Sequence, residues 1–137
     1  MPRARWSALA LPANVRQIRE SVVDFACTNG ISERRAADIR LAVSEAVANA
    51  VLHAYHRYAQ PGSVCVFAAV ELGWLELRVV DDGTGMARRN DSPGAGLGLP
   101  LISMLADQVE VRRRPGRDGT ELWMRFRLDE PTRTPTG

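Results

Sequence analysis

The stretch Glu45-Ala-Val-Ala-Asn49, inside a long run rich in alanine and valine, decides much of the fold of this chain. On a helix, residues four apart share one face, so Glu45 and Asn49 would lie together. An acid and an amide are costly to bury without partners. The spacing predicts that both side chains line a pocket. An amphipathic helix whose polar face happens to hold both residues explains the same pattern.

A second motif, Asp81-Asp-Gly-Thr-Gly85-Met86, directly follows the alternating stretch 74–80. A carboxylate at the end of a strand can accept a hydrogen bond from an exocyclic amine. Gly83 and Gly85 permit backbone angles and a close approach that side chains would forbid. A simple Asp-Gly turn is the alternative, because such turns are common.

A third motif, Gly94-Ala-Gly-Leu-Gly98-Leu99, opens a predicted helix at 97–106. Free N–H groups at a helix start can bind an anion, and a flexible linker that caps the helix is the alternative. The motif does not join the first strand and helix of a βαβ unit, so a Rossmann fold is excluded. Further on, Thr120 begins a predicted strand, where its hydroxyl could reach Asp81 or a ligand; β-propensity alone also explains a threonine there.

Hydrophobic periodicity predicts helices separated from a sheet. The expected strands are 5–11, 63–71, 74–80, 108–113 and 119–128, and the expected helices are 13–28, 32–56 and 97–106. Helices on one face of a mixed, mostly antiparallel sheet give an α+β two-layer sandwich. We expect a single domain over residues 1–130 and a frayed tail over 131–137. Within 74–80, alternation predicts that Leu75, Leu77 and Val79 face the helices.

The composition narrows the class of protein. The chain has 137 residues, is 45% hydrophobic and carries a net charge of +2, which is enough for one core and too little to imply nucleic-acid binding. All its basic residues are arginine. Cys27 and Cys65 lack metal-ligand spacing and are expected to be buried free thiols. His53 and His56 are expected at the surface, since no third metal ligand is evident.

The sequence contains no stretch as long as a membrane span, and a signal peptide is not expected because no long apolar region precedes Pro12. We therefore expect a cytoplasmic protein that binds neither membranes nor nucleic acid directly. The two unspaced thiols fit a reducing compartment.

Taken in order, the motifs resemble the GHKL, or Bergerat, ATP-binding fold of gyrase, heat-shock chaperones and histidine kinases. The segment Ser44-Glu-Ala-Val-Ala-Asn-Ala-Val-Leu-His-Ala-Tyr55 is similar to the N-box of bacterial anti-sigma factor serine/threonine kinases. The likeness extends from about residue 6 to residue 128. It implies a histidine kinase-like ATPase domain that uses ATP and Mg²⁺.

The resemblance also implies roles for single residues. Glu45 would be the catalytic base, Asn49 the Mg²⁺ ligand, and Asp81 the acceptor of the adenine amine, helped by Thr120. The remaining nucleotide contacts would come from His53, Gly83, Gly85, Met86, Gly94, Gly96, Leu97, Gly98 and Leu99, with an ATP lid at 87–95. Phosphoryl transfer depends mostly on positioning and charge neutralisation, which these groups supply.

The implied partners are a sigma factor and a STAS-type antagonist protein whose serine or threonine is phosphorylated, contacted in part by Arg19, and the implied assembly is a homodimer. The stretch between Met86 and Gly94 is shorter than in the kinases it resembles. Gly94 stands where some of them carry a phosphate-contacting arginine, and Arg88 and Arg89 are the nearest substitutes. The alternative is a partner-binding switch, nucleotide-gated or nucleotide-free, without kinase activity.

Overall fold

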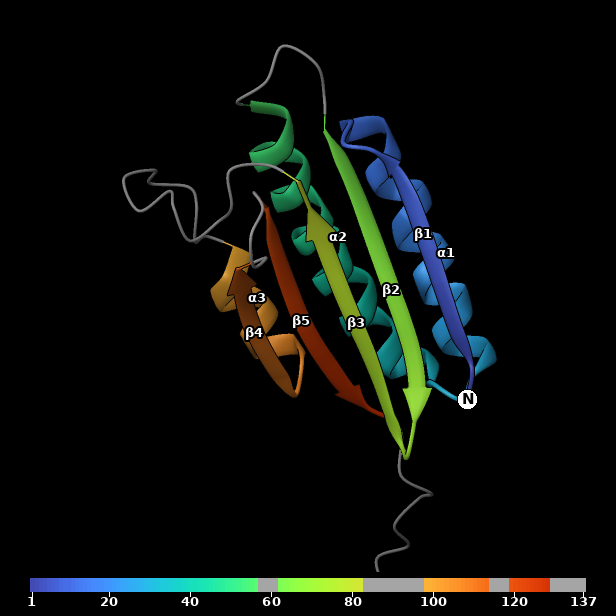
Figure 1. The fold of residues 1–137 in the computed structure, drawn as a ribbon. Coiled ribbons are helices and arrows are strands. Elements are labelled where there is room, and N and C mark those ends of the chain that lie inside the picture. Colours follow the sequence, from blue (N-terminus) through green and yellow to red (C-terminus); the bar gives the residue numbers. More distant parts are fainter. Residues whose placement is uncertain (57–61, 83–97, 114–118, 129–137) are drawn as a thin grey trace, which may run out of the picture.

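The computed structural model describes residues 1–56, 62–82, 98–113 and 119–128. Helices and strands follow one another along the chain as shown in Figure 1. The elements are β1 (Arg3–Leu9), the 3₁₀ turn η1 (Pro12–Asn14), α1 (Val15–Thr28), α2 (Glu33–His56), β2 (Ser63–Glu71), β3 (Trp74–Asp81), α3 (Gly98–Leu105), β4 (Gln108–Arg113) and β5 (Thr120–Arg127).

The strands form one five-stranded sheet in the order β1-β2-β3-β5-β4, and every described pair is antiparallel. The expectation of a mixed sheet therefore narrows to an antiparallel one. The β2–β3 hairpin turns through Leu72 and Gly73, which both have positive φ, at 54° and 84°. Two-residue hairpin turns favour positive φ because it matches the twist of the strands, and glycine adopts it without strain. This order puts β3 in the middle of the sheet.

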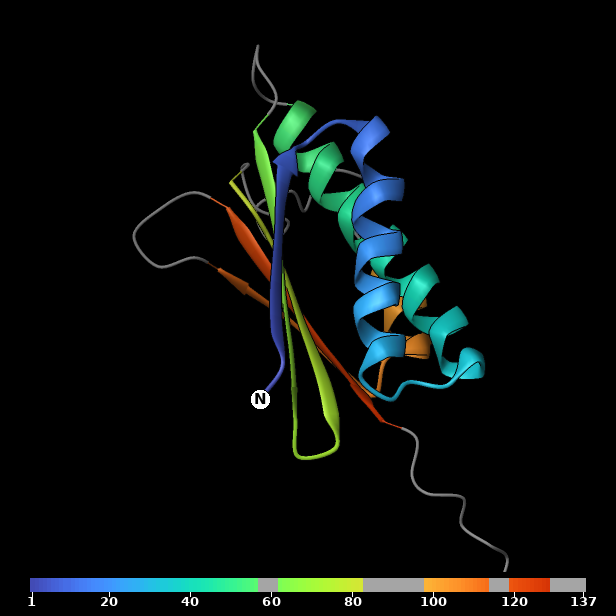
Figure 2. The same cartoon turned by 90° about the vertical axis from the view of Figure 1, so that its right-hand side faces the viewer.

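Among the described residues, the helices cover one face of the sheet and leave the other face without a helix (Figure 2). Leu75, Leu77 and Val79 of β3 are buried beneath the helices, which confirms the predicted alternation. Trp74 and Arg78 lie on the open face and are half-buried. The chain is thus an α+β two-layer sandwich, as the sequence predicts.

The central helix, α2, packs against α1, α3, β2 and β3. Its buried stripe consists largely of small side chains, which let the helix lie close to the sheet. The buried residues are Ala36, Ile39, Ala42, Val43, Ala46, Val47, Ala50 and Val51. None of the helices in the described ranges combines the length and the apolar character that a membrane crossing needs.

Two expectations from the sequence are wrong. β1 begins at Arg3 and ends at Leu9, because its pairing with β2 stops there and Pro12 opens a 3₁₀ turn. Cys27 is exposed and Cys65 is half-buried, although both are free thiols. Cys27 lies beside the buried stripe of α1, and Cys65 alternates with buried valines and so belongs to the open face of the sheet.

Arg35 of α2 joins three elements. Its Nη1 donates to Asp38 Oδ2 at 2.9 Å and to the backbone oxygen of Leu105, at the end of α3, at 3.0 Å. Its other terminal nitrogen pairs with the carboxylate of Asp107, and the guanidinium lies over the Phe126 ring at 5.2 Å from the centroid. A single side chain therefore fixes the C-terminal end of α3 against α2 and the sheet.

We expect Arg35→Ala to lower the free energy of unfolding by about 2 kcal/mol, since it removes the charged hydrogen bonds to α3 and Asp107 and the contact with the Phe126 ring. Urea denaturation followed by circular dichroism measures this. The matched control is Arg34→Ala, at an exposed neighbouring position, with an expected change within about 0.5 kcal/mol. Equal effects of the two substitutions would contradict the linking role.

Candidate functional site

Glu45 and Asn49 lie at the margin of the buried stripe of α2. Each precedes a buried alanine, Ala46 or Ala50, and each is itself half-buried. One helical turn separates them, so their side chains share a face. The helix places a carboxylate and an amide together between the core and solvent, as the spacing predicts.

The amide nitrogen of Asn49 is buried and has no hydrogen-bond partner within the described ranges. An unsatisfied buried polar group costs about 1–3 kcal/mol. Native structures retain few such groups, and those that remain are often explained by a ligand or an ion. Asn49 therefore presents a polar group suited to a bound molecule.

Asp81 ends β3 and is 3% exposed, and Thr120 begins β5 and is 1% exposed. The register of β3 and β5 pairs these two residues directly. Both side chains belong to the face of the sheet that the helices cover. Opposite residues in an antiparallel pair have Cβ atoms about 5 Å apart, so one small ligand group can reach both side chains.

These elements converge at one end of the molecule (Figure 1). The end of β3, the start of β5, the C-terminal half of α2 and the start of α3 all lie there. Gly98 is the first residue of α3, and Leu99 follows it, half-buried against the core. The free N–H groups at the start of α3 thus lie at the same end as Asp81 and Asn49.

For the other predicted nucleotide-binding residues, the structure describes either no atoms or only the backbone. The glycine-rich turns and the lid lie beyond the described residues, as do Gly83, Gly85, Met86, Gly94, Gly96 and Leu97. His53 belongs to α2, but its side chain is not described. Their roles remain predictions.

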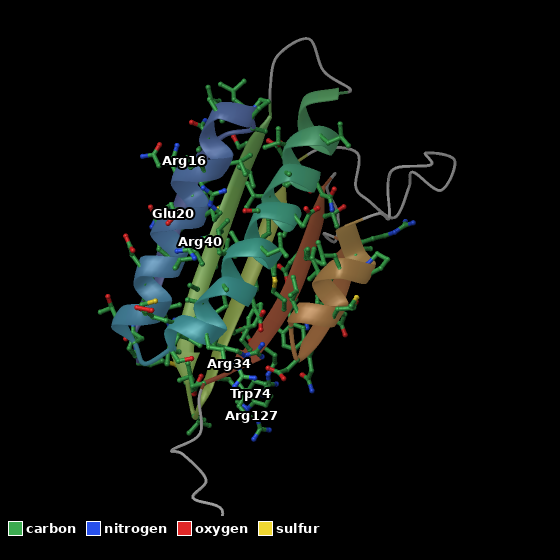
Figure 3. The ribbon with its side chains drawn as sticks, turned by 180° about the vertical axis from the view of Figure 1, so that it is seen from behind. Arg16, Glu20, Arg34, Arg40, Trp74 and Arg127 are labelled. Carbon is green, nitrogen blue, oxygen red and sulfur yellow. The ribbon has the colours of Figure 1, made fainter. Side chains whose placement is uncertain are left out.

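Arg19 of α1 reaches across to α2. Its Nη1 donates to Ser44 Oγ at 3.5 Å, and its Nε donates to Glu20 Oε2 at 2.8 Å. Arg40 of α2 donates to the same Glu20 oxygen at 3.2 Å. Figure 3 shows Glu20 on α1 beside Arg40 on α2. The hydrogen bonds from Arg40 and then Arg19 lower the pKa of the Glu20 carboxyl below its ordinary value.

The sequence motifs do not reveal this cluster. Ser44 is adjacent to Glu45, so Arg19 is anchored one residue away from the acid of the site. Glu20 and Arg40 come from two helices, and no local spacing predicts such a pairing. Their signal in the sequence is limited to opposite charges on two amphipathic helices.

Together the described residues make a polar site at the edge of an apolar core. The buried Asp81 carboxylate can accept a hydrogen bond from an amine, and the Asn49 amide can serve a metal ion or a phosphate. Glu45 is partly exposed and can take a proton from a group that approaches from solvent. This set of donors and acceptors fits a purine nucleotide accompanied by a divalent cation.

Known proteins share this fold and sequence. Residues 8–126 match the family described as "Histidine kinase-like ATPase domain". An anti-sigma F factor from Clostridium acetobutylicum is 29% identical over 128 residues, covering 85% of this chain and 87% of that protein. The serine-protein kinase RsbW of Listeria monocytogenes is 32% identical over 121 residues, covering 75% of this chain and 76% of that protein.

A solved structure extends the likeness. The crystal structure of the RsbU and RsbW domains of Rv1364c from Mycobacterium tuberculosis superposes with a TM-score of 0.74 at 26% identity. It covers 96% of this chain, which spans 34% of that larger chain. The family match covers most of the sequence and agrees with the fold. The chain therefore belongs to the histidine kinase-like ATPase domain family.

Proposed function

We propose that this chain is an ATP-dependent anti-sigma regulator, which phosphorylates a serine or threonine of a STAS-type antagonist protein and sequesters a sigma factor. One observation carries the proposal: a half-buried acid and amide on α2 lie at the same end of the fold as the buried Asp81. The names of the relatives, anti-sigma F factor and serine-protein kinase, support it.

ATP is the nucleotide that the site favours. The carboxylate of Asp81 would accept a hydrogen bond from the 6-amino group of adenine, and Thr120 would support the same contact. The phosphates would extend toward the start of α3, where Gly98 and Leu99 follow the glycine-rich turns. Asn49 would hold Mg²⁺ through its amide oxygen, and the ion would neutralise phosphate charge when bound.

In the proposed phosphoryl transfer, Glu45 would act as the general base. Its carboxylate would accept the proton of the substrate hydroxyl as the hydroxyl oxygen bonds to the γ-phosphorus of ATP. The bond from that phosphorus to the β,γ-bridging oxygen breaks, and ADP departs with the electron pair. Glu45 is half-buried and therefore remains open to a hydroxyl presented by another protein.

The same proposal includes the partners of the protein, its assembly and its location in the cell. Arg19 would contact the partners from α1, beside Ser44. A homodimer, which the family resemblance implies, and a cytoplasmic location are part of the same proposal. His53 and the residues of the two glycine-rich turns would complete the nucleotide contacts.

We expect Glu45→Ala to reduce phosphotransfer by about 100-fold or more, because general base catalysis contributes on that scale, while ATP affinity changes little. The measurement is transfer of labelled phosphate from ATP with Mg²⁺ to the purified STAS-type antagonist encoded nearest to this gene. The matched control is Glu33→Ala, an exposed acid in the first turn of the same helix, with unchanged transfer expected.

The outcome also separates the two candidate functions. Wild-type protein that binds ATP but transfers no phosphate to any antagonist tested would exclude the kinase and leave a nucleotide-gated switch. Wild-type protein that binds the antagonist but no nucleotide, even with Mg²⁺, would leave a nucleotide-free switch.

We expect Asn49→Leu to raise the free energy of unfolding of the nucleotide-free protein by about 1 kcal/mol, because it removes an unsatisfied amide and introduces a better helix former. The same change should weaken ATP binding in Mg²⁺ by about tenfold or more. Urea denaturation and calorimetric titration measure the two effects.

The matched control is Asn29→Leu. The side-chain nitrogen of Asn29 donates to Phe25 O at 2.8 Å, so this substitution should destabilise the protein and leave ATP affinity unchanged. A loss of stability in Asn49→Leu equal to that in Asn29→Leu would show that the Asn49 amide is satisfied in the free protein.

A further inference from the structure

An apolar stripe lies exposed on α2 around Glu45. Leu41, Glu45, Ala48 and Leu52 share one face of the helix by their spacing. Leu41 is 43% exposed, Leu52 is 52% exposed and Ala48 is exposed. The carboxylate assigned to the transfer step therefore lies between two accessible leucines.

The exposure of these leucines is not required by the fold. The opposite side of α2 already buries its own stripe against the sheet, with Ile39, Val43 and Val47 fully covered. Isolated exposed apolar residues are ordinary at protein surfaces. Two leucines on one helix face, with an alanine and a site residue between them, form a short apolar stripe beside Glu45.

Positive charge borders this stripe on the side of α1. Arg19 and Arg40 both pair with the carboxylate of Glu20. Arg16 is exposed on α1, one turn before Glu20 (Figure 3). Arg19 is joined to the stripe through Ser44, next to Glu45. Hydrogen bonds from Arg40 and Arg19 lower the pKa of the Glu20 carboxyl, so this one carboxylate stays charged and pairs with both arginines.

This inference rests on the proposed kinase function. We propose that Leu41, Ala48 and Leu52, together with Arg19 and Arg40, form the docking face for the phosphoacceptor protein. That protein would present apolar side chains beside its target hydroxyl, and a carboxylate that replaces Glu20 as the partner of the two arginines. We call these five residues the α2 docking face.

The position of Glu45 among the residues of the α2 docking face favours the phosphoacceptor protein as its partner over a second copy of the chain. A hydroxyl that gives its proton to Glu45 must come within hydrogen-bond distance of it, about 3 Å. The protein that carries the hydroxyl must then cover the neighbouring positions on this helix face. Leu41 lies one turn before Glu45, Ala48 lies one turn after it, and Leu52 lies two turns after it. A second copy bound symmetrically on this face would cover Glu45 and exclude the substrate.

The first test replaces both leucines by a polar residue of similar size that favours helices, Leu41→Gln with Leu52→Gln. We expect the Kd for the unphosphorylated antagonist and the KM for phosphotransfer to rise about tenfold, with kcat and ATP affinity unchanged. Calorimetry measures both affinities. The matched control is Leu72→Asn in the turn that precedes β3. Leu72 is 91% exposed, and all four quantities should stay unchanged.

The second test removes the carboxylate of Glu20, which would compete with a partner's carboxylate for Arg19 and Arg40. Glu20→Gln leaves Arg19 and Arg40 without their shared carboxylate, so an acidic partner should bind several-fold more tightly, with a steeper dependence on salt. A purely structural role of Glu20 would instead lower the thermal midpoint and leave or weaken partner affinity.

The outcomes distinguish this inference from the function on which it rests. If wild-type protein phosphorylates the antagonist but the double glutamine variant matches it in Kd and KM, the docking face is wrong and the kinase stands. If wild-type protein phosphorylates no antagonist, both the kinase function and the docking face are wrong. Dimer dissociation of the double variant on ultracentrifugation, with antagonist affinity retained, would assign the face to a second copy and also overturn the inference.

Discussion

A carboxylate buried at the end of the central strand is the constraint on which this site depends. Asp81 is 3% exposed and continues the buried series of β3, after Leu75, Leu77 and Val79. Burying a charge is costly unless polar groups stabilise it. The antiparallel register meets part of this requirement by placing Thr120 opposite Asp81. The sheet thereby positions one acidic group under the helices, where a ligand amine can be recognised.

Much of the fold is predictable from the sequence, because the sheet has one covered face. The strands predicted at 63–71 and 108–113 have their observed bounds, and alternation within 74–80 gives the buried side of β3. The site is predictable where its groups are close in sequence, as with Glu45 and Asn49, or follow a strand, as with Asp81. Burial on α2 and at the strand ends agrees with these expectations.

Contacts between distant residues could not be predicted. Arg35 bonds to Leu105 and Asp107, and Arg19 bonds to Ser44, because packing brings their elements together. The exposure of the cysteines is not predictable for a similar reason, since apolar neighbours in sequence do not specify which face a side chain occupies. The cluster of Arg19, Glu20 and Arg40 depends on how two helices pack, so charge patterns alone do not locate it.

We propose that the Asp81 carboxylate selects adenine by accepting a hydrogen bond from the exocyclic amine of the base. Calorimetric titration in Mg²⁺ with ATP and with inosine triphosphate tests this selection. Inosine carries an oxygen where adenine carries the amine, so it would set one acceptor against the Asp81 carboxylate. We expect ATP to bind at least about tenfold more tightly than inosine triphosphate. Equal affinities for the two nucleotides would contradict it.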